Sequence, residues 1–596
     1  MSGNPSIRAC LAPVALLSLV VYGCTAEGYR EEADAEVYEI LKDKRLAAMG
    51  QTRDQAPDFV VEAKADSLRK RLLDEIKAGL KPKLEISLED ALNIAAENSD
   101  AFQTQRESLY RAALALTTQR NRYSTIWSGG AGATVDGVGK DGQVEGRTSA
   151  DLSASKILAS GATVLGGFVT NFFKVFTSGG GWDATSLLGM SITQPLLRGF
   201  GSTVTMEPLT QSEGDAAYDI RNYERFRLDF CITVVADYLA VIENQNNLQN
   251  QIANTKSLVD NRKQATDMSL AGRMQRFEVD QAQQQELTAR DNELASRTRL
   301  KTTMDRFKAT LGVPIETELS LRSGSLQAMQ DFGVGALDLQ EEEAFEIALK
   351  NRLDLKNRTE QVQDRARKIL VAENALKMGL DISAAVDVPN RSSSNAGKLD
   401  WREFQWQVGL QLDLPLNRTP ERNIYRSALI DYDAEARSLS HFIDTIKREI
   451  RISLRNLDQA RRSYEIQQNS LSLAEVRVDS TKLLVDAGRA QMRDFLNSQD
   501  DLLEAQTRLT AALVNYVVTK LELLNDLQLL EVGESGLSLD IIAMSSWRRE
   551  DKPDVRLKGM EESPEADKSG KDPKDGDPKD DTRKDPAKDP AKDKKE

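Results

Sequence analysis

One stretch decides the fold of this chain of 596 residues: residues 450–495, IRISLRNLDQARRSYEIQQNSLSLAEVRVDSTKLLVDAGRAQMRDF. Apolar side chains recur here at every seventh position: Ile450, Leu457, Tyr464, Leu471, Val478 and Val485. After Gly488 a second series has the same spacing: Phe495, Leu502, Leu509, Tyr516, Leu523 and Leu530. A sustained spacing of seven is typical of supercoiled α-helices, and glycine commonly ends a helix where the chain turns back. The stretch therefore predicts a long helical hairpin.

The same pattern occurs earlier in the chain. Ala271, Gly272 and Arg273 align with Ala487, Gly488 and Arg489 at an offset of 216, and five more pairs follow: Glu278 with Asp494, Gln283 with Gln499, Leu287 with Leu503, Ala289 with Ala505, and Leu311 with Leu527. A second match joins residues 192–198 to 412–418, and a third joins 91–95 to 344–348. The three matches keep their order in both halves, which predicts an internal duplication.

Each half should contain one very long helix. Pro208 and Pro420 mark the helix starts, and at 1.5 Å per residue the helices would run roughly 90 to 100 Å to the glycine tips. In the first half the predicted seam is formed by Val234, Val241 and Leu248 beside Tyr238, Ile252 and Val259, with Gln245 and Thr255 interrupting. A hairpin of this length cannot bury its seam alone. It needs its own repeat or other chains.

Six further stretches have the composition of strands: residues 126–138, 149–157, 162–173, 185–193, 380–388 and 404–414. In the last of them, Trp406, Val408, Leu410, Leu412 and Leu414 alternate with mostly polar residues. Alternation over about ten residues is typical of a transmembrane barrel strand, although any single strand also fits a half-buried soluble sheet. The soluble sheet does not explain why strands interrupt two long hairpins at matching places.

The N-terminus has the features of an export signal. Arg8 precedes an apolar run over residues 11–22, which suits a signal peptide and is too short for a permanent membrane helix. The run ends in Val21-Tyr22-Gly23-Cys24, which resembles a lipobox and predicts lipidation of Cys24; an ordinary signal peptide with an incidental cysteine is the alternative. After it, no stretch of 18 apolar residues remains. Any membrane span must therefore be a β-strand.

These features divide the chain into five parts. We expect a lipoprotein signal peptide over 1–23, an N-terminal periplasmic extension over 24–86, a first repeat of strands and helical hairpin over 87–330, a second over 331–535, and a disordered charged tail over 536–596. The tail has almost no apolar residue after Met560, so it has little to bury.

Composition excludes several classes of function. The net charge of −14, without a basic patch, excludes a nucleic-acid partner. The chain has one histidine, His441, and three cysteines, which removes most metal-ligand sets and most pairs of a nucleophile with its base. The sequence therefore predicts a protein that is not an enzyme and that uses no cofactor and no metal.

The duplicated strands and hairpins, the exit Gln194-Pro-Leu-Leu-Arg-Gly-Phe-Gly201 and the two glycine tips resemble the outer-membrane factors of tripartite efflux pumps, the TolC type, over about residues 87–532. This resemblance implies an α+β fold in which three protomers form one transmembrane β-barrel, joined to a long α-helical coiled-coil barrel. In that family each protomer gives four strands, so we expect residues 149–173 to include an enlarged external loop.

The resemblance also implies a function and partners. The chain would be a homotrimeric exit duct, lipid-anchored in the outer membrane with a large periplasmic part, in an efflux or type I secretion system. Its partners would be outer-membrane lipid, a periplasmic adaptor (membrane fusion) protein and an inner-membrane pump, proton-driven or ATP-driven. The alternative is a non-conducting coiled-coil lipoprotein that spans the periplasm.

By resemblance, Glu278 and Asp494 lie at the periplasmic entrance, with Asn497 in place of a second acid. The adaptor would contact the two tips, residues 271–273 and 487–489. An acid in the first turn of a helix also stabilises that helix through the exposed N–H groups and the helix dipole, so both roles stay open for Glu278 and Asp494.

Overall fold

The structure is a computed structural model that describes residues 25–49, 61, 67–137, 144–176, 181–322, 339–392, 395–532 and 539–541. Residues Met1–Ile542 form one compact unit, and everything below concerns that unit. The predicted signal peptide and Cys24 lie outside the described residues, as does the predicted tail over 536–596 except Leu539–Ile541, which form a strand instead of the expected disordered segment.

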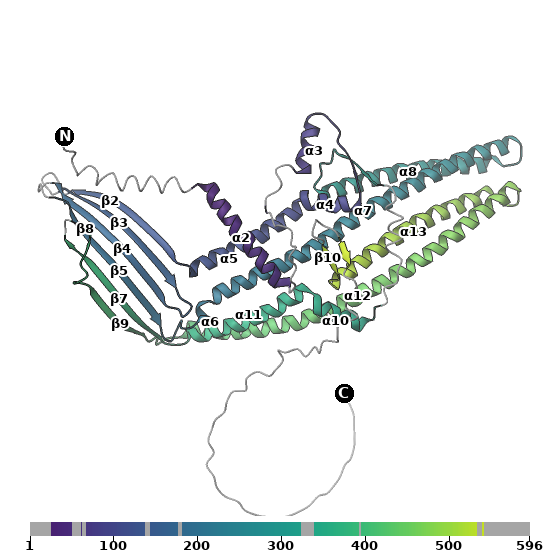
Figure 1. Cartoon of the computed structure of the whole chain (residues 1–596). Coiled ribbons are helices and arrows are strands. Elements are labelled where there is room, and N and C mark those ends of the chain that lie inside the picture. Colours follow the sequence, from purple (N-terminus) through teal and green to yellow (C-terminus); the bar gives the residue numbers. More distant parts are fainter. Residues whose placement is uncertain are drawn as a thin grey trace, which may run out of the picture. The chain divides into compact units, whose positions relative to one another are not determined.

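The element order repeats within the chain (Figure 1), as the three sequence matches predict. In the first half, α4 (Leu88–Asn98) and α5 (Asp100–Tyr123) lead into strands, and the chain leaves them through α6 (Ser202–Thr205) into α7 (Glu207–Leu270) and α8 (Arg276–Leu311). In the second half, α10 (Glu341–Asn351) and α11 (Leu353–Ala375) lead into strands, followed by α12 (Thr419–Asp486) and α13 (Met492–Asp526). The paired lead-in helices are nearly equal in length, which supports a duplication.

The long helices have the predicted extent. Helix α7 has 64 residues and α12 has 68, so each is about 100 Å long, and Pro208 and Pro420 stand in their first turns. All twelve residues of the two seven-residue series in α12, α13 and Leu530 are buried or half-buried. In α7 the prediction is wrong at Ile252, which is 42% exposed, whereas Thr255 is buried. The Thr255 hydroxyl can be buried because it donates a hydrogen bond to the Gln251 carbonyl.

The two hairpins bury their seams against each other near the tips. One apolar cluster draws members from all four long helices: Leu258, Ala265, Ala282, Ala289, Val485, Met492, Phe495 and Leu496. The repeat therefore supplies part of the partner surface that a single hairpin lacks.

Each tip is a tight glycine turn. Gly272 and Gly488 have φ angles of +70° and +69°, a left-handed conformation that glycine adopts without a Cβ penalty. The N–H of Gly488 donates to the Val485 carbonyl, and the N–H of Arg489 donates to the Leu484 carbonyl at 2.8 Å. This pattern satisfies carbonyls that the last turn of a helix leaves without partners, which explains why both helices end at a glycine.

The strands form one antiparallel sheet in the order β2 (Ile126–Gly137), β3 (Val144–Ile157), β4 (Thr163–Val175), β5 (Asp183–Pro195), β7 (Gly379–Ser392) and β9 (Gln405–Asp413). The short β8 (Asn395–Leu399) pairs with the end of β7. All six stretches with strand composition therefore contribute strands to one sheet.

The expected external loop within residues 149–173 is wrong. Strands β3 and β4 pair along their whole length and join through a tight turn, in which the Leu158 N–H donates to the Ala162 carbonyl at 2.8 Å and Gly161 has φ +92°. The expectation came from the strand number of the family. The residues themselves have strand composition, and pairing satisfies their backbone groups.

Smaller elements pack around the helices. Helix α2 (Ala26–Met49) places Val37 and Leu41 against α5 and α7, in a cluster that includes Leu109 and Ile220. Helix α3 (Leu68–Lys77) and strand β1 (Lys83–Ile86) contact α4. Strand β1 pairs in parallel with β6 (Glu318–Leu321), and β10 (Leu530–Val532) pairs with β11 (Leu539–Ile541).

Candidate functional site

The sheet has one apolar face that crosses all six strands. Its register places one row of residues side by side from edge to edge: Trp127, Ala154, Gly166, Met190, Val386 and Trp406. A neighbouring row runs Leu152, Phe168, Leu188 and Val388. Trp127, Met190 and Trp406 are 61–69% exposed. A soluble protein normally covers so large an apolar patch, so this face requires an apolar environment or a partner.

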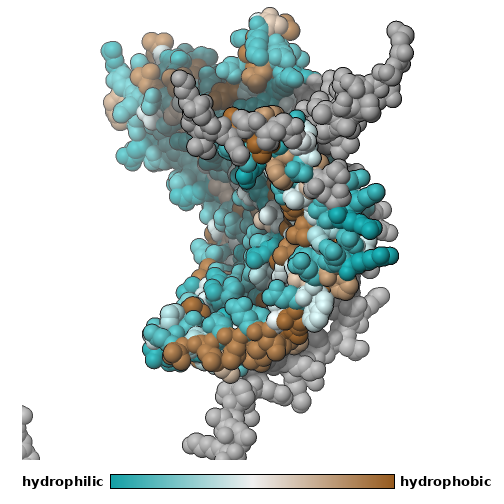
Figure 2. Space-filling model, turned by 90° about the vertical axis from the view of Figure 1, so that its left-hand side faces the viewer, coloured by the Kyte–Doolittle hydropathy of each residue, from teal (hydrophilic) through white to brown (hydrophobic). Residues whose placement is uncertain are grey.

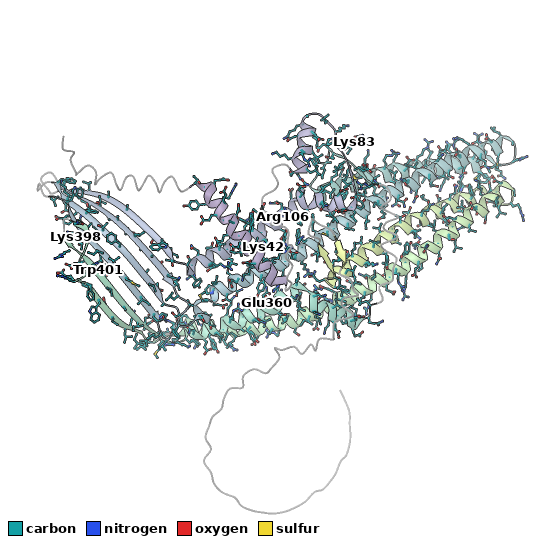
Figure 3. The ribbon with its side chains drawn as sticks, in the orientation of Figure 1. Lys42, Lys83, Arg106, Glu360, Lys398 and Trp401 are labelled. Atoms are coloured by element: carbon teal, nitrogen blue, oxygen red, sulfur yellow. The ribbon has the colours of Figure 1, made fainter. Side chains whose placement is uncertain are left out.

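The space-filling view shows the same tendency. Figure 2, which looks onto the side that carries the sheet, shows hydrophobic residues gathered in a band across its lower part. Trp401, in the loop between β8 and β9, lies beside the sheet (Figure 3) and borders a hollow on the apolar face together with Trp127 and Met190.

The opposite face of the sheet is mainly polar, although β4 and β5 also place Leu165, Val169, Phe173 and Leu187 on it. Its row across the six strands is Ser128, Ser153, Gly167, Gly189, Asp387 and Gln405. The hydroxyl oxygens of Ser128 and Ser153 are 2.7 Å apart across β2 and β3. Walls of transmembrane barrels have an apolar and a polar face, and so do half-buried sheets of soluble proteins.

The predicted entrance acids occupy equivalent positions. Glu278 and Asp494 are each the third residue of the returning helix, α8 or α13. Glu278 is half-buried and takes part in a capping box, because its carboxylate accepts a hydrogen bond from the Gln275 N–H at 3.2 Å. Asp494 is exposed, 4.0 Å from Arg493, and Asn497 is also exposed. The structural role is therefore visible for Glu278, while Asp494 presents its carboxylate to solvent.

The tip residues are all exposed: Ala271, Gly272, Arg273, Ala487, Gly488 and Arg489. Because the two hairpins share an apolar cluster just behind them, both tips lie at the same end of the helices. The structure brings together the two groups of residues that the sequence predicts as one contact surface.

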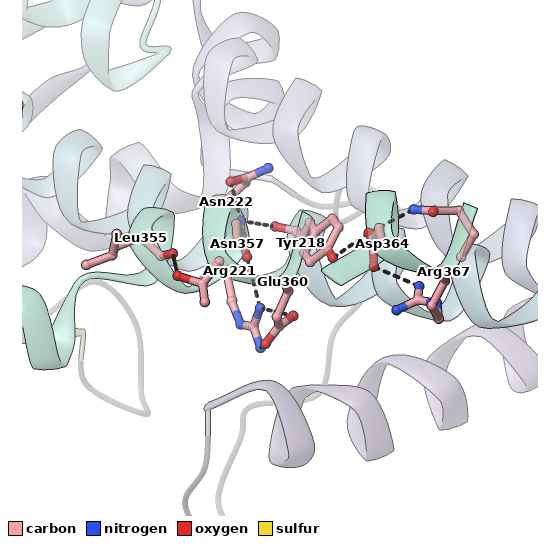
Figure 4. Close-up of polar contacts among 10 residues, drawn as sticks. Tyr218, Arg221, Asn222, Leu355, Asn357, Glu360, Asp364 and Arg367 are labelled. Atoms are coloured by element: carbon pink, nitrogen blue, oxygen red, sulfur yellow. Dashed lines mark hydrogen bonds and ion pairs between the residues drawn. The ribbon is translucent and has the colours of Figure 1, made fainter. Parts of the chain in front are cut away.

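A partly buried ionic network between α7 and α11 was not predicted (Figure 4). Arg221 donates two hydrogen bonds of 2.7 Å to the Glu360 carboxylate and one of 3.0 Å to Asn357. The Tyr218 hydroxyl donates to Asp364 at 2.7 Å, and burial together with this contact raises the pKa of Tyr218. The partners are about 140 positions apart in sequence, so no local pattern reveals them.

A second hub joins three helices at Arg352, which is 4% exposed. Arg352 donates to Asp354 at 2.8 Å and to Glu449 of α12 at 3.0 Å, and Arg225 of α7 also pairs with Asp354. Burial opposes ionisation of Asp354, but hydrogen bonds from Arg352 and the charge of Arg225 outweigh it and hold the pKa of Asp354 below its usual range. The hub fixes the first repeat to the second.

Polar contacts also connect the hairpins toward the tips. The Asn261 amide donates to Gln499 at 2.7 Å, Gln499 donates to the Ser257 hydroxyl at 2.7 Å, and Gln264 donates to Asp486 at 3.0 Å. These contacts complement the apolar cluster and link α7 to α12 and α13.

Among the described residues, no three His, Cys, Asp or Glu side chains gather as a metal site. Cys231 is buried in α7, and burial raises the pKa of its thiol to about 12. In the same part of the chain, no helix combines the length and apolar composition needed to cross a bilayer.

This chain is similar to known proteins in structure but not detectably in sequence. No family profile and no curated protein matches the sequence. Solved structures that are similar to this chain include the following three outer-membrane proteins. The Campylobacter jejuni outer membrane channel CmeC is 13% identical with a TM-score of 0.54, covering 77% of this chain and 88% of its own. The outer-membrane channel OprN is 13% identical in sequence with a TM-score of 0.55, and the match covers 80% of this chain and 97% of OprN. The Vibrio cholerae outer membrane protein VceC is 13% identical in sequence with a TM-score of 0.52, and the match covers 74% of this chain and 95% of VceC. This chain therefore has the fold of the TolC-type outer-membrane efflux channels.

Proposed function

We propose that this chain is one protomer of a trimeric outer-membrane channel, the exit duct of a tripartite efflux or type I secretion system. The observation that carries the proposal is the apolar row that crosses six strands from Trp127 to Trp406, opposite a polar face. Lipid would cover the first face and water the second. Structures with the same fold are outer-membrane channels, which supports this location and a role in transport rather than catalysis.

Trimer formation is supported by a second apolar seam on the long helices. On α12, Ile466 and Leu473 are exposed and seven residues apart, as are Val476 and Leu483. On α8, Leu287 and Leu294 are exposed with the same spacing. A seam of this kind packs against a neighbouring helix. Two hairpins cannot enclose a tunnel, so α12 of one copy would pack on α8 of the next until the ring closes.

The trimer can be tested directly. The purified protein in mild detergent should have the mass of three copies. Leu473→Glu should shift the mass toward the monomer, because it places a charge in the proposed seam. Glu475→Gln, a change at a neighbouring exposed position, should leave the trimer intact. A monodisperse monomer for the parent protein would exclude the model.

Conductance separates the channel from its alternative. In planar bilayers the trimer should conduct ions, whereas a coiled-coil spacer that only spans the periplasm should conduct none. Trimers that insert and remain silent, even after charge changes at the entrance, would favour the spacer.

The tips are the proposed contact for a periplasmic adaptor protein, which would connect the duct to a proton-driven or ATP-driven inner-membrane pump. Arg273 and Arg489 are exposed and repeat-related, so one adaptor surface could recognise both. Changing both to Glu should abolish export in cells while leaving trimer mass and bilayer conductance unchanged. Export at the parental rate would remove the tips from the contact surface.

Cys24 is the proposed lipid anchor, and it lies outside the described residues. Cells expressing Cys24→Ser should lose incorporation of a fatty-acid analogue into the protein. Equal labelling of the parent and this variant would leave only an ordinary signal peptide.

A further inference from the structure

We infer that all six strands of each protomer belong to the barrel wall, and that β9 of one copy pairs with β2 of the next. Six strands from each of three copies give a barrel of eighteen strands. The inference rests on the proposed trimer and goes beyond it, because the resemblance implies only four strands per protomer. The strands β3 and β4 would be wall and not an external appendage.

The hairpin of β3 and β4 is continuous with the rest of the sheet. Strand β3 pairs with β2 on one side and β4 on the other, and β4 pairs with β5, without a break in register. The two strands have 14 and 13 residues, and a strand crosses a bilayer with about 9–11. Both strands are therefore long enough to span.

The hairpin also has the same two faces as its neighbours. On the apolar face, Leu152 pairs with Phe168, and both continue the row that reaches Leu188 and Val388. On the polar face, Ser153 lies beside Ser128 and Gly167, and β4 adds the apolar Leu165, Val169 and Phe173 to this face. An external flap would not need to continue both faces of the wall.

The two edges of the sheet are complementary in direction. Strand β2 starts directly after α5 and runs away from the helices, while β9 runs back toward them into α12. With an even number of strands, these edges are antiparallel to each other, so copies can join edge to edge without a parallel pair. In the described part of the chain, no other strand pairs with the outer side of β2 or β9. Unpaired backbone groups are strongly unfavourable in lipid, and a second copy satisfies them.

Closure with eighteen strands changes the width of the duct. Barrel diameter grows roughly in proportion to strand number, so the ring would be about 1.5 times as wide as one of twelve strands. Barrels of 16–18 strands leave an aqueous channel. The lumen at the outer membrane would therefore admit bulkier solutes than a wall of four strands per protomer.

Disulfide cross-linking tests the proposed pairing of β9 with β2 of the next copy. In a background with Cys231→Ala, Ser128→Cys on the polar face of β2 is combined with Gln405→Cys, Gln407→Cys or Gln411→Cys on the polar face of β9. Oxidation in membranes should link copies into a ladder ending at the trimer for one of these registers. The control pairs Ala131→Cys, on the apolar face of β2, with the same β9 positions, and it should give no ladder. If no register gives cross-links, β9 does not pair with β2 of the next copy and the inference is overturned.

Solvent labelling tests the hairpin independently. In membranes, Ser153→Cys should react with a membrane-impermeant thiol reagent through the lumen, and the adjacent Leu152→Cys should show loss of labelling because lipid covers it. Equal labelling of both positions in a trimer that still conducts would place β3 and β4 outside the wall and overturn this inference while leaving the channel intact. A protein that neither trimerises nor conducts would instead contradict the proposed function.

Discussion

Gly312 and Gly272 have the same backbone conformation and different surroundings. Both have a φ of +70°, and both follow a long helix, α8 or α7. A Cβ at Gly272 would meet nothing within 4 Å, whereas one at Gly312 would lie 2.0 Å from the backbone oxygen of Asn98. The end of α8 therefore lies directly against the junction of α4 and α5, and the Gly312 carbonyl also accepts a hydrogen bond from Arg69 at 2.9 Å.

This pair separates backbone strain from steric overlap. Gly272→Ala should cost about 1 kcal/mol, the strain of a left-handed alanine. Gly312→Ala should cost several times more, because a backbone oxygen cannot move aside as a side chain can. Thermal unfolding of both variants measures the two losses of stability. Equal losses would mean that the backbone at the α4–α5 junction shifts to accommodate the added Cβ without cost.

Arg352 illustrates a buried charge that holds elements together. Its partners Asp354 and Glu449 belong to α11 and α12. Removing the arginine leaves the Asp354 carboxylate with less compensation, so Arg352→Gln should cost about 3 kcal/mol at pH 7. Arg451→Gln is the control, because the pair of Arg451 with Glu341 lies at the surface with both side chains partly exposed, and the change should alter stability less than Arg352→Gln.

The deficit of Arg352→Gln should depend on pH. The pKa of Asp354 is lowered in the folded protein, so its contribution is present above the unfolded pKa, about 3.9, and is lost as pH falls through the folded value. Denaturation at pH 7 and pH 3 should therefore show a smaller gap between parent and variant at pH 3. A constant gap would assign the loss to packing.

At the scale of elements, the two returning helices start alike and use their acids differently. Glu278 caps α8 through the Gln275 N–H, whereas Asp494 at the same place in α13 is exposed beside Arg493. Gln can replace Glu in a capping box, so Glu278→Gln removes charge and keeps the cap, while Glu278→Ala removes both.

These variants separate capping from a role at the entrance. Glu278→Ala should cost about 1 kcal/mol of stability and Glu278→Gln much less. If the acids also line the periplasmic mouth, Asp494→Asn combined with Glu278→Gln should reduce cation preference and multivalent-cation block in bilayers. Unchanged selectivity in the double variant would leave the capping role alone.

The elements that the sequence predicts well are those set by local pattern. Gly272 and Gly488 end their helices because the turn needs a left-handed residue, and the strand at Trp406 follows from alternation. Two features depend on distant residues. The sequence predicts an external loop within residues 149–173, whereas β3 and β4 pair there as part of the main sheet. The contact of Arg221 with Glu360 joins positions that are far apart in sequence and meet only in the folded chain.

At the scale of the whole molecule, the polar face of the sheet is strongly acidic. It carries the acids Asp136, Glu145, Asp151, Asp183, Asp381, Asp387 and Asp413, against two bases, Arg147 and Arg391. Arg147 pairs with Glu145 at 2.8 Å, and Asp413 pairs with Arg198 at 2.6 Å. Asp151 and Asp387 lie beside glycines of the next strand, Gly130 and Gly189, where no side chain displaces them.

In the proposed trimer this face would line the duct with three copies of each carboxylate, so the wall itself should favour cations. Asp151→Asn with Asp387→Asn should lower cation preference in bilayers, and Asp413→Asn should change it less, because Arg198 already offsets that charge. The effect should fade from 0.1 M to 1 M salt, since the screening length shortens from about 10 Å to about 3 Å. If selectivity follows Asp494 alone and ignores the wall variants, the narrow mouth controls passage and the acidic wall is too wide to act on ions that pass along its axis.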